Sequence, residues 1–523
     1  MDTKLNPYSS FLLEAFEVKE DLASLQEGMR VNPIVSELAT WYEKLRNAMD
    51  YREEEVVLRA AIERILKRRH FYGGNGKTIA TPLLRELVWA RYFPDGSISE
   101  DTIQNVEEII EIYLSLKTLI SQKHKMDAAS LNDFMYHLIS SHLTYALNKN
   151  EKRETMTNFM FHIMKEHVII EDDAPEVKDV QVFIGVRRAF AKDDIALVHY
   201  HLFTQYFGVP SKDTIEQIAD DFLNGYQEIE KQLKYPLRHK IFAFLKRNCA
   251  SFLVLEEILL RHIDNPKKFV QNEVELKEET YNTCKEKYNN IRAKVNRAIV
   301  RSIIFVLLTK TFIALTVEGT VERVFYGSIM WSTISLNIAI PPIILGIASL
   351  FIKTPNDENT ENILKQIKVL LFNDNPKIAR IITLHKNPRK NRSLIFFIIT
   401  LLWPLAFIAS FGLVLYGLNL LHFNLISQIV FVFFLTIISF LIYRIYQTAH
   451  TYTVLRKQTV ITPVIDFFFM PIARVGRHLT EGVSHINVLL FIFDFIIEAP
   501  FKGLFAFFEQ WFMFLHSKRE YMD

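Results

Sequence analysis

Three polar features interrupt stretches of the chain that are otherwise apolar enough to cross a membrane. Lys310 and Glu318 lie eight residues apart, and Asn337 precedes the double proline Pro341 and Pro342. A lysine in the middle of a membrane span costs about 3 kcal/mol on insertion scales unless it is paired or faces a wet cavity. Two prolines remove helix hydrogen bonds and predict a kinked or broken helix. Together these residues predict an intramembrane polar site.

Two other interpretations of these features remain open. Lys310 could be buried against helix carbonyls, and residues 301–352 could form a shallow re-entrant pair instead of two full crossings. The polar-site interpretation predicts a small-solute or ion transporter or channel. Both alternatives predict a structural role for the same residues.

The soluble half contains strings that resemble catalytic or binding motifs only in part. GGNGKT at residues 73–78 ends in the Lys-Thr of a phosphate-binding loop, but Phe71 stands where the first glycine belongs, and a basic helix precedes it instead of a strand. HIMKEH at residues 162–167 matches neither HExxH nor HxxEH. We therefore predict a helix end and loop at the glycines, and neither an enzyme, a metal site nor a cofactor.

Acidic pairs and closely spaced histidines also suit ordinary structural roles. Adjacent carboxylates on a helix diverge, and two of the three Asp-Asp pairs stand where helix N-caps are expected. His199 and His201 are two residues apart, so they do not face one another on a helix. The three acidic pairs are Asp172/Asp173, Asp193/Asp194 and Asp220/Asp221.

The element that organises the chain is the run from Ser393 to Tyr443. Its 51 residues contain no Asp, Glu, Lys or Arg, whereas about 20 apolar helical residues span a bilayer. Gly417 to Asn424 can turn the chain, so we predict a helical hairpin of two crossings. Ser302–Val317 and Ser328–Ile352 supply the first two crossings.

Lysine and arginine gather beside the spans on one side only, whereas the two opposite turns contain only Arg323. By the positive-inside rule both ends of the chain are expected in the cytoplasm, most simply at a bacterial cytoplasmic membrane. Four basic residues of the 353–392 loop are predicted to contact anionic lipid headgroups. They are Lys386, Arg389, Lys390 and Arg392.

The tail from Asn487 to His516 shows a thin polar stripe on an apolar helix pattern. Asp494, Glu498 and Lys502 follow at steps of four and predict i, i+4 partners. A wide apolar face of this kind predicts a helix that lies in the membrane interface or packs under the bundle.

The predicted fold is all-α: a cytoplasmic multi-helix domain, a four-helix transmembrane region and C-terminal interfacial amphipathic helices. The expected parts are a flexible N-terminal arm (1–30), a cytoplasmic all-helical domain (31–265), a helical stalk (266–300), a first transmembrane pair (301–352), a basic cytoplasmic loop (353–392), a second hairpin (393–443) and cytoplasmic-side interfacial helices (444–523).

Composition narrows the classes of function. The net charge of +2 gives no footprint for nucleic acid. Cys249 and Cys284 form no CxxC motif, and the first residues lack a signal-peptide core, so a reduced cytosolic location is expected for the first half. We predict a membrane-anchored scaffold or interaction protein with a cytoplasmic protein partner. A transporter is the alternative, a lipid-modifying enzyme has no supporting motif, and the oligomeric state stays open.

Overall fold

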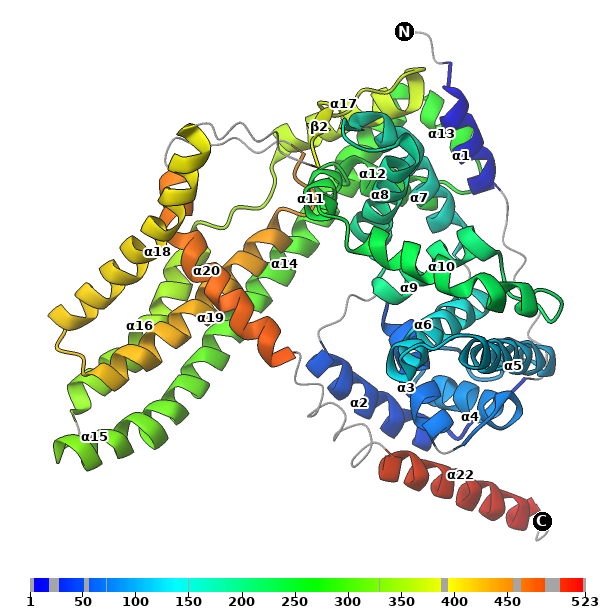
Figure 1. Cartoon of the computed structure of the whole chain (residues 1–523), viewed down its shortest axis with the longest axis horizontal. Coiled ribbons are helices and arrows are strands. Elements are labelled where there is room, and N and C mark those ends of the chain that lie inside the picture. The colour runs from blue at the N-terminus through cyan, green and yellow to red at the C-terminus, as the bar shows by residue number, and fades with distance from the viewer. Residues whose placement is uncertain are drawn as a thin grey trace. The chain divides into compact units, whose positions relative to one another are not determined.

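The computed structural model describes residues 4–17, 28–50, 56–71, 73–148, 150–328, 330–386, 394–454, 462–484 and 499–520. They form two compact units, and each is described by itself. The helical unit comprises Leu5–Cys249, Asp374–Lys386 and Val488–Asp523, and the membrane unit comprises Met1–Lys4, Ala250–Asn373 and Asn387–Asn487. The described chain is almost entirely helical, which confirms the predicted all-α class (Figure 1).

The helical unit is built from the following elements: α1 (Pro7–Glu17), α2 (Pro33–Asp50), α3 (Val57–Phe71), α4 (Gly76–Trp89), α5 (Glu100–Lys123), α6 (Ala128–Leu147), α7 (Glu151–Met164), β1 (Val168–Ile170), α8 (Pro175–Val186), a π-helical turn (Arg187–Ala191), α9 (Ile195–Phe207), α10 (Ile215–Leu233), α11 (Arg238–Arg247), β2 (Ile382–Leu384) and α22 (Ala499–Glu520).

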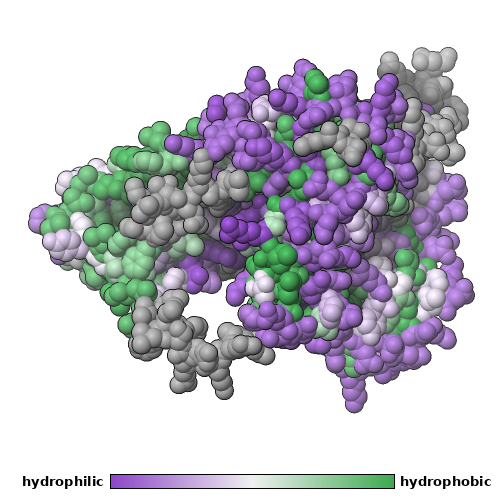
Figure 2. Space-filling model, turned by 90° about the horizontal axis from the view of Figure 1, so that it is seen from above, coloured by the Kyte–Doolittle hydropathy of each residue, from purple (hydrophilic) through white to green (hydrophobic). Residues whose placement is uncertain are grey.

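The membrane unit is built from α12 (Ala250–Arg261), α13 (Pro266–Gln271), α14 (Glu273–Ile313), the π-helical turn η4 (Ala314–Glu318), α15 (Gly319–Tyr326), α16 (Trp331–Leu350), α17 (Asp357–Phe372), α18 (Leu394–Leu420), α19 (Leu425–Ala449) and α20 (Thr462–Ser484). Figure 2 shows hydrophobic side chains over much of the visible surface of this unit.

The core of the helical unit forms around α6. Helices α3, α5 and α9 all pack against it, and α10 packs against both α5 and α9. Phe134 of α6 makes edge-to-face contacts with Phe203 and Phe222, whose side chains are fully buried. Side chains recurring at three and four residues on each helix supply the apolar faces that these contacts cover.

The N-terminal segment departs from the expected flexible arm. Residues 7–17 form α1, which packs against α7 and buries Leu12, Leu13 and Phe16 completely. Tyr8 of the same helix stacks on His162, with ring centroids 5.8 Å apart. The sequence pattern is short and weak, but tertiary burial stabilises the helix.

A two-stranded parallel sheet is the one feature of the described residues outside the all-helical pattern. Val168–Ile170 pairs with Ile382–Leu384 in the register Val168 to Ile382. The strand pair returns residues 374–386 to the helical unit, so the predicted loop 353–392 is not one uniform segment. Its first part also forms a helix, α17, whose Ile363 and Ile367 are fully buried.

Four described helices are long and apolar enough to cross a membrane, as the sequence predicted. They are the continuous helix Glu273–Phe325, Trp331–Leu350, Leu401–Leu420 and Leu425–Ala449. The first of them joins the predicted stalk to the first span without a break. Helix α14 packs against α16 and α19, and α18 packs against α19 and α20.

The turn between α18 and α19 lies inside the predicted segment. His422 adopts a left-handed conformation with φ of 57°, and the Asn424 side chain accepts a hydrogen bond from the backbone N–H of Ser427 to cap α19. The double proline does not break its helix, because α16 continues through Pro341 and Pro342. Neighbouring spans provide the burial that keeps such a helix together.

Helix α20 packs closely against two of the spans, α18 and α19. A Cβ atom at Gly476 would lie 1.9 Å from the carbonyl oxygen of Thr436, which stands near the middle of α19. Only glycine fits this approach. Small residues allow helix backbones to come together in a membrane, so α20 approaches α19 closely at this point.

Glu86, a buried carboxylate of α4, joins three helices of the helical unit. Both oxygens of Glu86 lie 2.5 Å from a guanidinium nitrogen of α3, one from Arg68 and one from Arg69, and Lys502 of α22 lies 3.8 Å away. Burial opposes ionisation, but these cations together lower the pKa of Glu86 to about 2. The carboxylate is therefore charged at neutral pH.

Replacing Glu86 with Gln should lower the free energy of unfolding by about 3 kcal/mol, because the buried cations Arg68 and Lys502 and the half-buried Arg69 lose their counter-charge. The folded pKa lies below the unfolded value near 4.5, so the contribution of Glu86 is present above pH 4.5 and is lost as the pH falls toward 2. Thermal unfolding of the purified protein across this range measures both effects. Glu108→Gln removes an exposed pair with Lys212 and should change stability by less than about 1 kcal/mol; equal losses in both variants would contradict the assignment.

Candidate functional site

The structure brings the predicted intramembrane residues together. Lys310 and Glu318 are fully buried, and the Lys310 Nζ atom lies 3.1 Å from Glu318 Oε1. Asn337 Nδ2 donates to Glu318 Oε2 at 2.5 Å, and the Ser427 hydroxyl donates to the same oxygen at 3.1 Å. One carboxylate therefore links the first, second and fourth candidate spans.

A π-helical turn places Glu318 on the same face of the helix as Lys310. Eight residues along a regular α-helix turn through about 800°, which leaves two side chains roughly 80° apart. The turn at Ala314–Glu318 holds one additional residue, which rotates the following chain back by about 100° and returns Glu318 to the face of Lys310. The sequence contains no signal for this turn, since its residues Ala-Leu-Thr-Val-Glu also suit an α-helix.

A second carboxylate one helical turn later joins the same elements near their ends. Glu322 is fully buried and accepts hydrogen bonds from the backbone N–H of Met330 at 2.9 Å and from Asn424 Nδ2 at 2.5 Å. Met330 and Asn424 are the N-cap residues of α16 and α19. Glu322 thus fixes the starts of two spans. The sequence places Glu322 near the outer end of the first span but gives no reason to include it in the predicted polar site, although its spacing of four from Glu318 puts both on one helix face.

The aromatic ring of Phe434 completes the surroundings of Lys310. The ammonium lies 4.8 Å from the ring centroid, which is within the range of cation–π attraction. Neither carbonyl burial nor a wet cavity is needed to explain the lysine, because Glu318 supplies the opposite charge. Pro341 and Pro342 are buried in α16 beyond Asn337.

One polar atom of the site has no hydrogen-bond partner among the described residues. Asn337 Oδ1 is buried, whereas its Nδ2 donates to Glu318 and, at 3.3 Å, to the carbonyl of Ser427. A buried acceptor without a donor costs about 1–3 kcal/mol. This atom is the acceptor of the site that a bound water or solute would satisfy.

The predicted lipid-contact and tail residues lie only partly in the described chain. Lys386 pairs with Asp173 at 3.0 Å and lies over the ring of Tyr235, so a headgroup would compete with that pair. Lys502 lies near Glu86 in the helical unit. Outside the described residues are Arg389, Lys390, Arg392, Asp494 and Glu498.

The glycine-rich string ends one helix and begins another. Gly73 has a φ of 82° after α3, and the Asn75 side chain caps α4. The Gly76 N–H, which would face a phosphate in a nucleotide-binding loop, donates to the Glu111 carboxylate at 3.0 Å. The string therefore has the predicted helix-end geometry.

Histidines of the helical unit bind neighbouring side chains. His137 and His199 place their Nδ1 atoms 3.0 Å apart, and His199 Nε2 lies 3.3 Å from Glu230. Burial lowers the pKa of His137 to about 4, so this ring is neutral at neutral pH. His201 contacts the Tyr145 hydroxyl instead. Among the described residues no three His, Cys, Asp or Glu side chains are placed to hold a metal ion.

The predicted capping role holds for one member of the central acidic pair. Asp194 accepts from the N–H of Leu197 at the start of α9 and also pairs with Arg59. Asp193 instead lies 2.6 Å from Arg187 in the protein interior. The pair is therefore neither a solvated face nor a set of carboxylates around one pocket.

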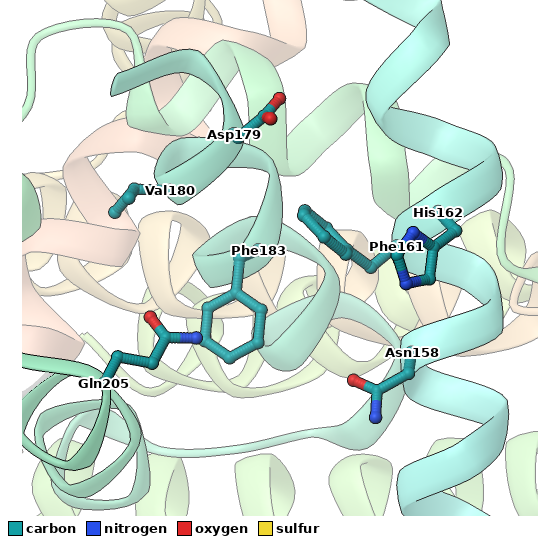
Figure 3. A pocket seen from close by; sticks show the side chains of 7 residues that line it. All are labelled: Asn158, Phe161, His162, Asp179, Val180, Phe183 and Gln205. Carbon is teal, nitrogen blue, oxygen red and sulfur yellow. The ribbon is translucent and has the colours of Figure 1, made fainter. Parts of the chain in front are cut away.

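A pocket of about 430 Å³ lies among α7, α8 and α9 (Figure 3). Phe161 and Phe183 meet edge to face with ring centroids 5.8 Å apart, and Asp179 pairs with Lys178 at 2.9 Å. The pocket is lined by Asn158, Phe161, His162, Asp179, Val180, Phe183 and Gln205. This lining contains no arrangement of nucleophile and base.

Comparison of the chain with protein families, curated proteins and solved structures gives no match. The evidence for function therefore comes from the residues of the chain itself.

Separate replacement of Lys310 by Met and Glu318 by Gln should each destabilise the folded protein by about 3 kcal/mol, since either change leaves its partner buried without a counterpart. The double variant should recover much of that loss. Thermal unfolding in lipid nanodiscs measures the cycle. Thr311→Val, which removes an exposed hydroxyl bound only within α14, is the control and should be nearly neutral. Additive losses in the double variant would contradict a direct pair.

Proposed function

We propose that the chain is a polytopic integral membrane protein whose helical unit acts as an interaction or scaffolding module on the cytoplasmic side of the bilayer. The four long apolar helices support the membrane location. The lysine and arginine distribution supports cytoplasmic termini. The carboxylates of the spans support a well-defined anchor, because Glu318 pairs with Lys310 and Glu322 binds the N-cap residues of two helices.

An exposed apolar row on α2 is the observation that carries the proposal. Ile34, Leu38 and Trp41 recur at steps of four and three and are 55, 46 and 64% exposed. The opposite side of the helix buries Val35 and Ala39. A helix that is apolar on both sides has a second surface for another protein, and such rows bind partner helices or grooves.

Basic residues near the spans are proposed to add a lipid contact. Arg389, Lys390 and Arg392 precede the third crossing, where anionic headgroups would attract them with about 1 kcal/mol each. Lys386 is the weaker candidate because Asp173 already neutralises it.

A photoreactive phenylalanine analogue in place of Trp41 should crosslink full-length protein to a discrete partner in native membranes. The same analogue at Ser121, an exposed position on α5, should give no such product. Leu38→Ser should reduce the yield at least several-fold without changing thermal stability, since the side chain is exposed. A product of the mass of two copies of this chain, equal products at both positions, or none, would refute the proposed partner surface.

A transporter or channel is the second candidate, and the unpaired Asn337 Oδ1 favours it. In this case Lys310→Leu should abolish solute or ion flux in reconstituted vesicles while protein is still inserted, because the replacement removes the cation of the site. Absence of flux in the parent protein, or flux unchanged by the substitution, would exclude this candidate.

A further inference from the structure

Helix α22 turns its polar side inward and its apolar side outward. Lys502 and Glu509 are only 6 and 4% exposed, and Phe505 between them is 3% exposed. These three positions fall within about 60° of one another around a helix with 100° per residue. A helix of a soluble protein has the opposite arrangement, with its charged residues in water.

Specific contacts hold the inward side of α22. Lys502 lies 3.8 Å from Glu86 and 5.9 Å from the centre of the Tyr42 ring. The Trp89 indole N–H donates a hydrogen bond to Glu509. Phe505 packs against the apolar side of α2 and the Trp89 ring. The contacts come from α2 and α4 as well as α22, so they fix which side of α22 faces outward.

The outward side forms a continuous apolar row. Along the sequence its five members are separated by three, four, three and one residues, which places them within about 100° of one another around the helix. Leu504, Phe507, Trp511, Phe514 and Leu515 are 47, 56, 49, 53 and 44% exposed. Gly503, which precedes the row, and Gln510 are also exposed. This row contains no charged side chain.

The bilayer is the occupant that the chain itself favours for this row. The four long apolar helices keep α22 tethered close to the lipid, at a high effective concentration. Trp prefers the boundary between headgroups and acyl chains, and Trp, Phe and Leu form the apolar face of helices that lie in that boundary. In the sequence Lys518 and Arg519 stand three and four residues after Leu515, and basic residues beside an apolar helix face attract anionic headgroups.

We propose that the outward row of α22 inserts into the headgroup boundary of the bilayer and holds the helical unit on the membrane surface. The inference rests on the membrane location in the proposed function and adds the contact surface and its ligand, the lipid interface. Insertion of roughly 5–10 Å would cover the apolar row, while Glu86 and Trp89 keep the polar side on the protein.

Spin labels on full-length protein test the proposal, because Cys249 and Cys284 are both buried. Single cysteines replace Phe507, Trp511 or Ser121, and a fourth replaces Leu413 of α18, which is 63% exposed. The protein is reconstituted one copy per nanodisc with anionic lipid. Collision with oxygen, which concentrates in lipid, is compared with collision with a water-soluble nickel chelate.

The proposal predicts that labels at positions 507 and 511 collide mainly with oxygen. The ratio of the oxygen collision rate to the nickel-chelate collision rate should be at least threefold higher there than at position 121. Position 413 reports the spans independently. Lipid contact at 413 with water contact at 507 and 511 would overturn the α22 assignment alone, and water contact at all of them would overturn the membrane location as well. Spin–spin broadening between labels at 511 in discs holding two copies, together with water contact in discs holding one, would assign the row to a second copy and also overturn it.

Discussion

The carboxylate of Glu318 is the group on which the arrangement of the spans depends. Hydrocarbon solvates neither charges nor backbone groups, so each polar atom placed there must find its partner in the protein. Glu318 receives Lys310, Asn337 and Ser427 from three different helices. Removing any donor leaves a group that lipid cannot satisfy, which makes the order and rotation of these helices mutually dependent.

The helical unit also uses buried charges to join its helices. Glu86 gathers cations from α3 and α22, and Arg187 is held by Glu154 and Asp193. In both units a single ion joins elements that are distant in the sequence. Such pairs add little net stability compared with apolar packing, but breaking one is costly. They therefore select one arrangement of helices among several that would bury equal apolar area.

The sequence predicted the helices better than the side-chain contacts between them. A run of 51 residues without charge left little choice but a helical hairpin, and apolar periodicity gave most helices of the helical unit. The predicted grouping of Lys310, Glu318 and Asn337 is present in the structure. Composition could not reveal the π-helical turn that aligns the first two, nor the contribution of Ser427, because a serine in a span has many hydrogen-bond options within its own helix.

Other differences come from tertiary contacts that no local pattern encodes. The segment expected as a flexible arm forms α1 because α7 covers its apolar face, and α16 continues through Pro341 and Pro342 because neighbouring spans bury it. Lys502 lies near Glu86, which is more than 400 residues away in the sequence, whereas its expected partner Glu498 is outside the described residues. Long-range partners of this kind follow from the fold and not from spacing.

Lipid as the solvent of the membrane unit is most directly tested by washing membranes of cells that express the full-length protein with alkaline carbonate. This treatment removes peripheral proteins and leaves spanning proteins in the bilayer. We expect the chain to sediment quantitatively with the membranes and to be released only by detergent. Recovery of the intact chain in the aqueous wash would contradict four crossings and the intramembrane role of Glu318.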